Sequence, residues 1–337
     1  MKTLINHFDD LLSQKLSFID VGARSGIPTN WEPFTKLMNV ISFEPDRDEY
    51  NTLSKNKKDN ETLINSALSS TDGTAIIYLT RERACSSLYR PNEKFLVQFP
   101  ESDRFTVEKI EVVKASRLDS LFNSGLLGKA DFIKIDTQGS ELEVLRGGKN
   151  LLKNVLGIEI EVEFAPMYEN QPLFRDVDEF ISTELGLHIM DLRKTYWKPA
   201  GSEYIGSPKG QLIFADALYL RPTDEIIELS LINQKDSDVI LKCVLIYIAY
   251  GYFDYALKLL DRLEITTILD EKNHALLKKS LQKNARNYSI PFLMKKTIPK
   301  IYTVINTVRH FFPYTRKGWG ISEQRVGTRK RFGVFDF

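Results

Sequence analysis

Short apolar segments that alternate with helical patterns most constrain how this chain can fold. The apolar segments cover residues 17–21, 40–43 and 62–65, and each ends in a polar or glycine-containing turn. Helical patterns lie between them over 29–38 and 46–57, and the first residue of the second pattern is an aspartate that can cap it. Strands that alternate with helices predict parallel βαβ units, so we expect an α/β protein with a doubly wound sheet.

The alternation of short apolar segments and helical patterns is interrupted after residue 73 and resumes at residue 131. Two strand-like runs, 75–80 and 105–113, flank a polar stretch over 85–88, which we interpret as a lid or an insertion beside the site. The elements predicted beyond it are a strand over 131–136, a helix over 140–145, a strand over 156–164, a helix over 176–185 and strands over 187–192 and 211–220.

The C-terminal third differs from the rest in pattern and in charge. Beyond the last predicted strand the pattern is helical, with a predicted helical hairpin over 239–249 and 253–263, so we expect domains over 1–221 and 222–337. The chain has a net charge of only +1, yet residues 291–337 hold ten Lys or Arg against two acidic residues. The remaining body is therefore acidic, and a uniformly basic nucleic-acid-binding surface is excluded.

Cysteine and histidine usage indicates neither a disulfide framework nor a metal site. Cys85 and Cys243 are far apart, and the four histidines lack ligand spacing. The N-terminal residues lack the apolar core of a signal peptide. The longest apolar run, 239–250, contains Lys242 and is too short to cross a bilayer. These features predict a cytoplasmic protein.

A glycine-containing turn follows the first predicted strand and carries the first candidate binding residues. It reads Asp20-Val-Gly22-Ala23-Arg24-Ser-Gly26, and Glu44 ends the next strand. An acidic residue about 20 residues past such a turn suits ribose hydroxyls, so a nucleoside-containing ligand is predicted. Arg24 replaces the second glycine of the GxGxxG pattern, which argues against NAD. An aspartate ahead of the turn suits the ammonium of S-adenosylmethionine; glycines that serve packing alone are the alternative.

The resemblance to a known family is strongest in Asp131-Phe-Ile-Lys-Ile-Asp136-Thr-Gln138-Gly139-Ser-Glu141-Leu-Glu143. This segment resembles the FkbM family of S-adenosylmethionine-dependent methyltransferases. Further pieces resemble the family in the same order, among them Asp20-Val-Gly22-Ala, Phe43-Glu44-Pro45, Ser86-Ser87-Leu88 and Glu161-Val-x-Phe164. The resemblance covers about residues 17–221 and leaves 222–337 outside.

This resemblance implies a class I methyltransferase fold: a Rossmann-like sheet of seven strands, the last one antiparallel, with S-adenosyl-L-methionine as cofactor. The implied cofactor residues are Asp20, Gly22, Ala23 and Gly26 at the methionine end, Glu44 at the ribose, Ser66 and Ala67 near the adenine, and Asp136 beside the methyl group. The resemblance leaves open whether Arg24 contacts the cofactor or an anionic substrate.

The reaction that the resemblance implies is methyl transfer to a hydroxyl, which benefits from a general base. The candidate catalytic residues are Asp136, Glu161 and His188. Since His188 lies in an apolar strand, a core histidine is the alternative. Glu161 is one of three glutamates that alternate along a predicted strand and share one face, and a buried Lys134–Glu161 ion pair is its alternative role.

The implied acceptor is a hydroxyl of a saccharide or glycan, such as a glycolipid or polysaccharide. Ser86, Ser87 and Tyr89 on the predicted lid are candidate sugar contacts. The tail over 291–337 interleaves basic and aromatic residues, which suits an anionic membrane surface or a single-stranded nucleic acid. Packing of this tail on the acidic body, or on a second subunit of a homo-oligomer, is the alternative.

Other classes of function stay open. One is a non-catalytic cofactor-binding module, and another is an RNA methyltransferase guided by the basic tail. The second is weakened because Asp136-Thr-Gln-Gly stands where an Asn/Asp-Pro-Pro-Tyr/Phe motif is expected. A nucleotide-sugar dehydrogenase or epimerase is opposed by the missing GxGxxG pattern.

Overall fold

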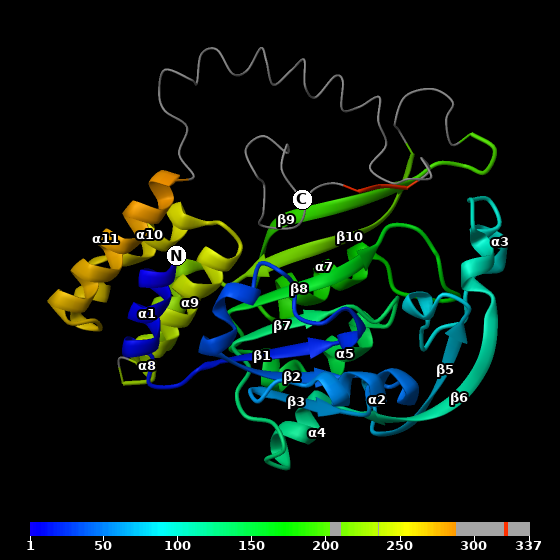
Figure 1. The fold of residues 1–337 in the computed structure, drawn as a ribbon, viewed down its shortest axis with the longest axis horizontal. Helices are drawn as coiled ribbons and strands as arrows, with labels where there is room; N and C mark the ends of the chain where they lie inside the picture. The colour runs from blue at the N-terminus through cyan, green and yellow to red at the C-terminus, as the bar shows by residue number, and fades with distance from the viewer. Residues whose placement is uncertain (203–209, 235, 288–319, 323–337) are drawn as a thin grey trace.

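A computed structural model describes residues 1–202, 210–234, 236–287 and 320–322, and its centre is an eight-stranded sheet (Figure 1). The strand order is β3-β2-β1-β7-β8-β10-β9-β11. The strands are β1 Leu16–Val21, β2 Met38–Phe43, β3 Glu61–Ile64, β7 Phe132–Ile135, β8 Gly157–Glu163, β9 His188–Trp197, β10 Gln211–Leu220 and β11 Gly320–Ser322.

The direction of these strands confirms the predicted class I methyltransferase fold. Neighbours from β3 to β8 are parallel, whereas β10 runs antiparallel between β8 and β9. The seven-stranded sheet with its last strand antiparallel is therefore present. An eighth strand, β11, pairs with the outer edge of β9.

The helices are α1 Lys2–Leu11, α2 Arg47–Asn56, α3 Glu93–Leu96, α4 Leu118–Asn123, α5 Glu141–Gly147, α6 Lys149–Leu152, α7 Phe174–Glu184, α8 Thr223–Ile232, α9 Ser237–Ala249, α10 Phe253–Leu260 and α11 Glu271–Asn287. Helix α2 begins where predicted because the Asp46 side chain accepts a hydrogen bond from the Asp48 backbone N–H. The helix expected over 29–38 is instead a shorter 3₁₀ helix, Glu32–Leu37.

Helices cover both faces of the sheet, as a parallel sheet requires. Side chains alternate along each strand, so Phe18 and Ile19 of β1 enter different clusters of buried side chains. The Phe18 cluster includes α1 and α8–α11, and the Ile19 cluster includes α4–α7. Residue 221 marks the change from sheet to helices, and residues on both sides of it contribute to the Phe18 cluster.

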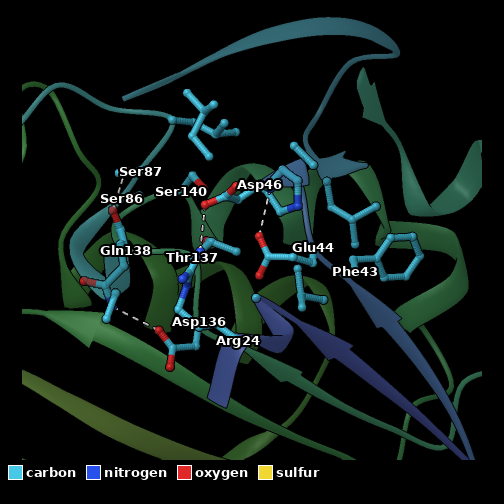
Figure 2. A pocket seen from close by; sticks show the side chains of 18 of the residues that line it. Arg24, Phe43, Glu44, Asp46, Ser86, Ser87, Asp136, Thr137, Gln138 and Ser140 are labelled. Carbon is cyan, nitrogen blue, oxygen red and sulfur yellow. Dashed lines mark hydrogen bonds and ion pairs between the residues drawn. The ribbon is translucent and has the colours of Figure 1, made fainter. Parts of the chain in front are cut away.

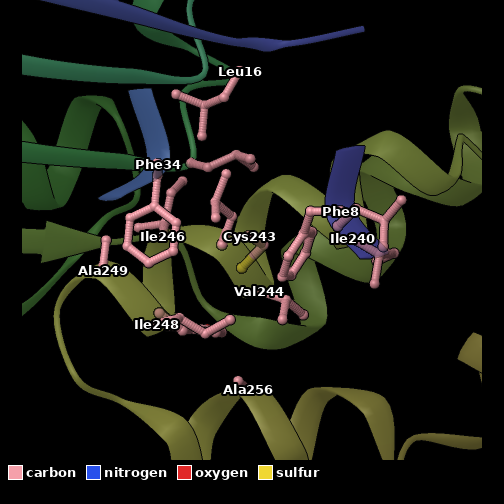
Figure 3. Close-up of a cluster of buried hydrophobic side chains, with 14 of the residues drawn as sticks. Phe8, Leu16, Phe34, Ile240, Cys243, Val244, Ile246, Ile248, Ala249 and Ala256 are labelled. Atoms are coloured by element: carbon pink, nitrogen blue, oxygen red, sulfur yellow. The ribbon is translucent and has the colours of Figure 1, made fainter. Parts of the chain in front are cut away.

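Helix α9 is the centre of the layer on the Phe18 side. Every residue from Ile240 to Ala249 is buried, and Phe8 of α1 and Ala256 of α10 pack around this helix (Figure 3). A helix that is apolar on all sides belongs in a core. Its single lysine, Lys242, pairs with Asp131 at 3.0 Å. The predicted helical hairpin is confirmed, and no helix among the described residues is long and apolar enough to cross a membrane.

A separate small sheet lies beside the main one (Figure 1). It consists of β4 Ala67–Leu68, β5 Gly73–Thr80 and β6 Val107–Ser116, in the order β4-β6-β5. The two predicted strands are present, and β6 extends to Ser116. After β5 the chain folds back, and the Tyr78 and Ser87 backbones exchange hydrogen bonds. This contact places residues 83–88, which include the polar stretch predicted as a lid or insertion, beside the carboxyl ends of the main strands.

Candidate functional site

A cavity opens at the carboxyl ends of β1, β2 and β7, and residues 83–88 border it from the small sheet (Figure 2). Open α/β sheets bind their ligands at this edge. The predicted cofactor residues that line the cavity are Gly22, Arg24, Glu44, Ser66, Ala67 and Asp136. Asp20, Ala23 and Gly26 do not line it, and the first two are buried. Lining residues to which the sequence analysis assigned no role in the site include Asp46, Thr137, Gln138 and Ser140.

Gly22 joins the ends of β1 and β7 at the base of the cavity. Its φ is +83°, and a Cβ atom there would lie 1.9 Å from the Asp136 carbonyl oxygen. The Asp136 backbone N–H in turn donates to Val21, and the Gly22 N–H donates to Phe43 of β2. Only glycine fits this close approach, because the carbonyl it would meet is backbone rather than a flexible side chain.

Glu44 points into the cavity from the end of β2 (Figure 2). Its Oε1 accepts a hydrogen bond from the Asp46 backbone N–H at 2.9 Å. Burial raises the pKa of Glu44 to about 7, although that hydrogen bond and the Arg24 charge oppose the shift. Its carboxylate and carboxylic acid forms are therefore both populated near neutral pH.

Arg24 is already engaged within the protein. Its guanidinium donates to Asp46 at 2.9 Å and to Glu49 at 2.8 Å, both at the start of α2. These two carboxylates tie the turn after β1 to α2. Arg24 therefore lines the cavity as a clamped side chain, and neutralises the Asp46 that caps the helix.

Asp20, Lys134 and Asp136, here called the pocket group, lie side by side on β1 and at the end of β7. The Lys134 Nζ is 4.0 Å from Asp20 and 3.4 Å from Asp136. Burial raises the pKa of Asp20 to about 6, and the Lys134 charge opposes this shift. Burial alone would lower the pKa of Lys134, but Asp136 and Asp20 outweigh it and the pKa rises. Lys134 is therefore a permanent cation between two carboxylates.

The Lys134–Glu161 ion pair expected from the sequence is wrong. The register of the two parallel strands places Lys134 opposite Glu159 rather than Glu161. Glu161 instead accepts a hydrogen bond from the Gln138 Nε2 at 2.6 Å. The charge of Lys134 is directed toward β1 and the end of its own strand.

The Gln138 side chain connects three other residues of the site. Its Nε2 bridges Asp136 at 3.0 Å and Glu161 at 2.6 Å, and its Oε1 accepts from the Tyr168 hydroxyl at 3.1 Å. The Gln138 backbone has a φ of +59°, and its carbonyl accepts from Ser87 at 2.6 Å. The Gln-Gly pair after Asp136 was the sequence signal for this residue, but the sequence did not reveal its bridging role.

Glu141, Glu161 and Glu163, here called the glutamate group, are all buried behind the loop 137–140. Each offers a carboxylate oxygen, and these oxygens all lie within 4.8 Å of one another. The Glu141 Oε1 accepts hydrogen bonds from the backbone N–H groups of Thr137 and Gly139. Burial raises the pKa of Glu141 to about 7, and burial and neighbouring carboxylates raise the pKa of Glu161 and Glu163 well above their usual range.

Glu159 takes part in a contact with the helical layer rather than facing solvent. It is half-buried and accepts a hydrogen bond from the Tyr250 hydroxyl, which in turn accepts from the Trp31 Nε1 at 3.1 Å. Burial raises the pKa of Glu159 to about 7. The residues after α9 thus reach the sheet close to Lys134.

The assignment of His188 as a candidate base is not supported, and neither is a core position. His188 is exposed and begins β9, where it pairs with Leu220. Leu220 pairs in turn with Gly157, the first residue of β8. His188 therefore lies at the edge of the sheet opposite the cavity, because β9 starts where β8 starts.

Ser86 and Ser87 connect their segment to β5 and to the loop 137–140. Ser87 donates to the Gln138 carbonyl and accepts from the Tyr89 backbone N–H at 3.0 Å. The Ser86 Oγ accepts from the Thr80 backbone N–H at 3.1 Å. Both serines line the cavity, and these internal hydrogen bonds fix the orientation of their hydroxyls.

The strand order and the cavity at the carboxyl ends define a methyltransferase of the class I fold. The family model described as the methyltransferase FkbM domain matches residues 20–189, which is half of the chain. The chain therefore belongs to the FkbM methyltransferase family. A search of curated proteins gave no match.

Several solved structures are similar to this chain at low identity. An FkbM methyltransferase from Methylobacillus flagellatus KT shares 16% identity at a TM-score of 0.38, over 63% of this chain and 45% of that one. The magnesium protoporphyrin IX methyltransferase (ChlM) from Synechocystis PCC 6803, with bound SAM, shares 10% identity at a TM-score of 0.32, over 66% and 77%. A putative tRNA (m1A22) methyltransferase from Streptococcus pneumoniae shares 13% at 0.30, over 84% and 96%. The chain thus spans less than half of the FkbM structure that it matches.

Proposed function

We propose that this protein is an S-adenosylmethionine-dependent O-methyltransferase that acts on a hydroxyl of a saccharide or glycan. The observation that carries this proposal is the placement of Glu44 and Asp136, which line one cavity from the ends of β2 and β7 (Figure 2). The first carboxylate suits the ribose of a nucleoside, and the second suits removal of a proton from an acceptor hydroxyl at the other end of the cavity.

The residues of the cavity fit S-adenosylmethionine. Glu44 presents a carboxylate that can accept from ribose hydroxyls, and Ser66 and Ala67, just past β3, border the region assigned to the adenine. The turn at Gly22 brings backbone close to the ligand. When bound, this cofactor supplies a methyl group that is already activated for transfer. The protein is then left to align the acceptor and to accept its proton.

Asp136 is the group that we assign to accept the proton of the attacking hydroxyl. Its side chain is about one-third exposed, at 31%, and borders the cavity, whereas Glu161 is buried and does not border it. Lys134 and Gln138 each contact one Asp136 oxygen and fix its orientation. A positioned base of this kind contributes about 10²–10⁴-fold in rate.

A stripe of charged side chains across the sheet supports a hydroxyl-rich acceptor. The paired register places Asp216 of β10 opposite Arg193 of β9, within reach of the Asp136 charge. The Arg193 guanidinium pairs with Asp216, and Arg193 is 30% exposed. Such polar groups in a row on a sheet face suit a ligand that carries several hydroxyls, as saccharides do.

The test is transfer of a radiolabelled methyl group from S-adenosylmethionine to glycans, glycolipids and RNA in parallel. We expect label in a glycan or glycolipid fraction, in a linkage stable to mild base as a methyl ether is. Asp136→Asn should lower turnover by about 10²–10⁴-fold and leave affinity for S-adenosylhomocysteine nearly unchanged. Glu143→Gln, a matched carboxylate on α5 that does not line the cavity, should retain full turnover.

Two outcomes of this experiment would favour a different function. Label in RNA alone, with binding that falls steeply with salt, would favour the RNA methyltransferase. Tight binding of S-adenosylhomocysteine without transfer to any acceptor would favour a non-catalytic binding module.

Peripheral contact with an anionic membrane is a separate proposal for residues 291–337. It is supported by the composition of this segment, ten basic residues with interleaved aromatics; apart from 320–322 it lies outside the described residues. Removal of residues 323–337 keeps β11 and still deletes Arg325, Arg329, Lys330 and Arg331. We expect the shortened protein to bind vesicles of anionic lipid more weakly than the full chain. Failure of the full chain to bind such vesicles would end this proposal.

A further inference from the structure

The glutamate group is the strongest feature of the molecule that the proposed methyl transfer does not use. Its members come from two elements: Glu141 begins α5, and Glu161 and Glu163 lie two residues apart near the end of β8. Their side chains reach the same point behind the loop 137–140, with carboxylate oxygens within 4.8 Å of one another. We propose that these three glutamates form a site for one hard divalent cation.

The size of the group suits such an ion. Two ligands on opposite sides of Ca²⁺ are separated by about 4.6–5.2 Å, and two on opposite sides of Mg²⁺ by about 4.1 Å. The observed span of up to 4.8 Å accepts Ca²⁺ as it stands and the smaller ions after a slight contraction. A donor set made only of carboxylate oxygens favours Ca²⁺, Mn²⁺ or Mg²⁺ over zinc or copper.

An unsatisfied atom within the group points to a ligand independently of the clustering. The Glu163 Oε1 is buried and has no hydrogen-bond partner, in a residue that is only 1% exposed. Buried polar atoms nearly always have partners, and a cation between the three carboxylates would supply one. Some other buried carboxylates of the described chain pair with basic residues, as Asp131 does with Lys242. The ion pairs among the described residues leave the glutamate group out.

A cation here would hold the loop that lines the cavity. Glu141 already binds the Thr137 and Gly139 backbone N–H groups, and Glu161 already binds Gln138. Fixing these two carboxylates therefore fixes the loop 137–139, including the left-handed backbone of Gln138. The ion joins the end of β8 to the start of α5, and its role is to position the loop.

The test is metal binding by the full-length protein after treatment with a chelator, measured without any methyl donor or acceptor. Mn²⁺ is titrated and the free ion is followed by electron paramagnetic resonance, and Ca²⁺ is titrated by calorimetry. We expect one ion per chain and a higher melting temperature in its presence. Glu163→Gln should weaken binding by about tenfold or more, since even changes around metal ligands cost 10–100-fold. Glu143→Gln, a carboxylate on the same helix that pairs with Arg146, should bind like the wild type.

Two results would overturn the proposal, one obtained with the wild type and one with the Glu163→Gln variant. Absence of saturable Mn²⁺ and Ca²⁺ binding to folded wild type would overturn the proposal, and would mean that the carboxylates are neutralised by protons. Binding that Glu163→Gln leaves unchanged would also overturn it. If Glu163→Gln does not fold, Glu163→Asp takes its place, because it keeps the charge and withdraws the carboxylate by one methylene.

Discussion

The pocket group and the glutamate group border the same loop, yet they accommodate buried carboxylates differently. In the pocket group Lys134 lies between Asp20 and Asp136, so one cation serves two acids. In the glutamate group three acids converge on one point without a basic partner among the described residues. A paired carboxylate can stay ionised and accept a proton, whereas an unpaired cluster has to acquire protons or a metal ion. The difference separates the group that faces the cavity from the group that supports it.

The contrast between the two groups requires the pocket group to depend on the close approach of β1 and β7. Gly22→Ala adds a Cβ that would lie 1.9 Å from the Asp136 carbonyl, at a φ of +83°. We expect it to lower the free energy of unfolding by at least about 3 kcal/mol and to abolish cofactor binding. Gly26→Ala is the control, since its φ is +68° but no atom lies within 4 Å, and it should cost only about 1–2 kcal/mol. Urea unfolding of both variants measures this.

Replacing Lys134 tests whether the buried carboxylates of the pocket group depend on its single cation. Lys134→Met leaves Asp20 buried without its partner, and we expect a loss of about 3–5 kcal/mol in the free energy of unfolding. Replacing Asp20 by Asn in the same protein should recover part of that loss. Lys109→Met, which breaks an exposed pair with Glu111, should cost far less than Lys134→Met. Equal losses at the two lysines would show that burial of the pocket group does not matter.

The pH dependence of cofactor affinity tests whether the Glu44 carboxylate binds the ribose hydroxyls. Its pKa of about 7 in the free protein means that the carboxylate needed for ribose hydroxyls is mostly absent at pH 6 and mostly present at pH 8. Affinity for S-adenosylhomocysteine should therefore rise about tenfold across this interval, and Glu44→Gln should flatten the rise. Since the folded-state pKa lies above the unfolded value of 4.5, Glu44 itself lowers the stability of the free protein as pH rises from 4.5 to 7. Calorimetry at several pH values measures the affinities.

The smallest expected effect is in the glutamate group when no metal is present. Glu163→Gln replaces one unpaired acid by a neutral side chain of the same shape and removes repulsion from Glu141 and Glu161. In the presence of a chelator we expect a gain of about 1 kcal/mol in the free energy of unfolding. Urea unfolding at neutral pH checks this prediction. A loss as large as that of Lys134→Met would mean that the two groups are neutralised in the same way.

Much of the fold and half of the site could be predicted because local pattern determines them. Buried strands that end in Gly22, Glu44 and Asp136 had to meet at one edge once the sheet was parallel, and they do. The partner of Lys134 depended on the register between β7 and β8, which no local pattern encodes. His188 was misplaced because an apolar strand does not reveal at which end of the sheet it starts.

The remaining differences arise from side chains that act over long sequence distances. Gln138 connects Asp136, Glu161, Tyr168 and Ser87, and only the folded chain brings these residues together. Ser86 and Ser87 line the cavity as the predicted sugar contacts would, and their internal hydrogen-bond partners are distant in sequence or outside any local pattern. Helix α9 was recognised as an apolar helix, yet its place against the sheet follows from tertiary packing alone.

The most direct test of the central claim is a calorimetric titration of the purified full-length protein with S-adenosylhomocysteine, alongside NAD. We predict micromolar binding of one S-adenosylhomocysteine per chain, no binding of NAD, and affinity reduced by at least about tenfold in Glu44→Ala. The Glu143→Gln variant should bind like the wild type. Absence of binding to the folded protein, or affinity that Glu44→Ala leaves unchanged, would contradict the assignment of this cavity to the cofactor.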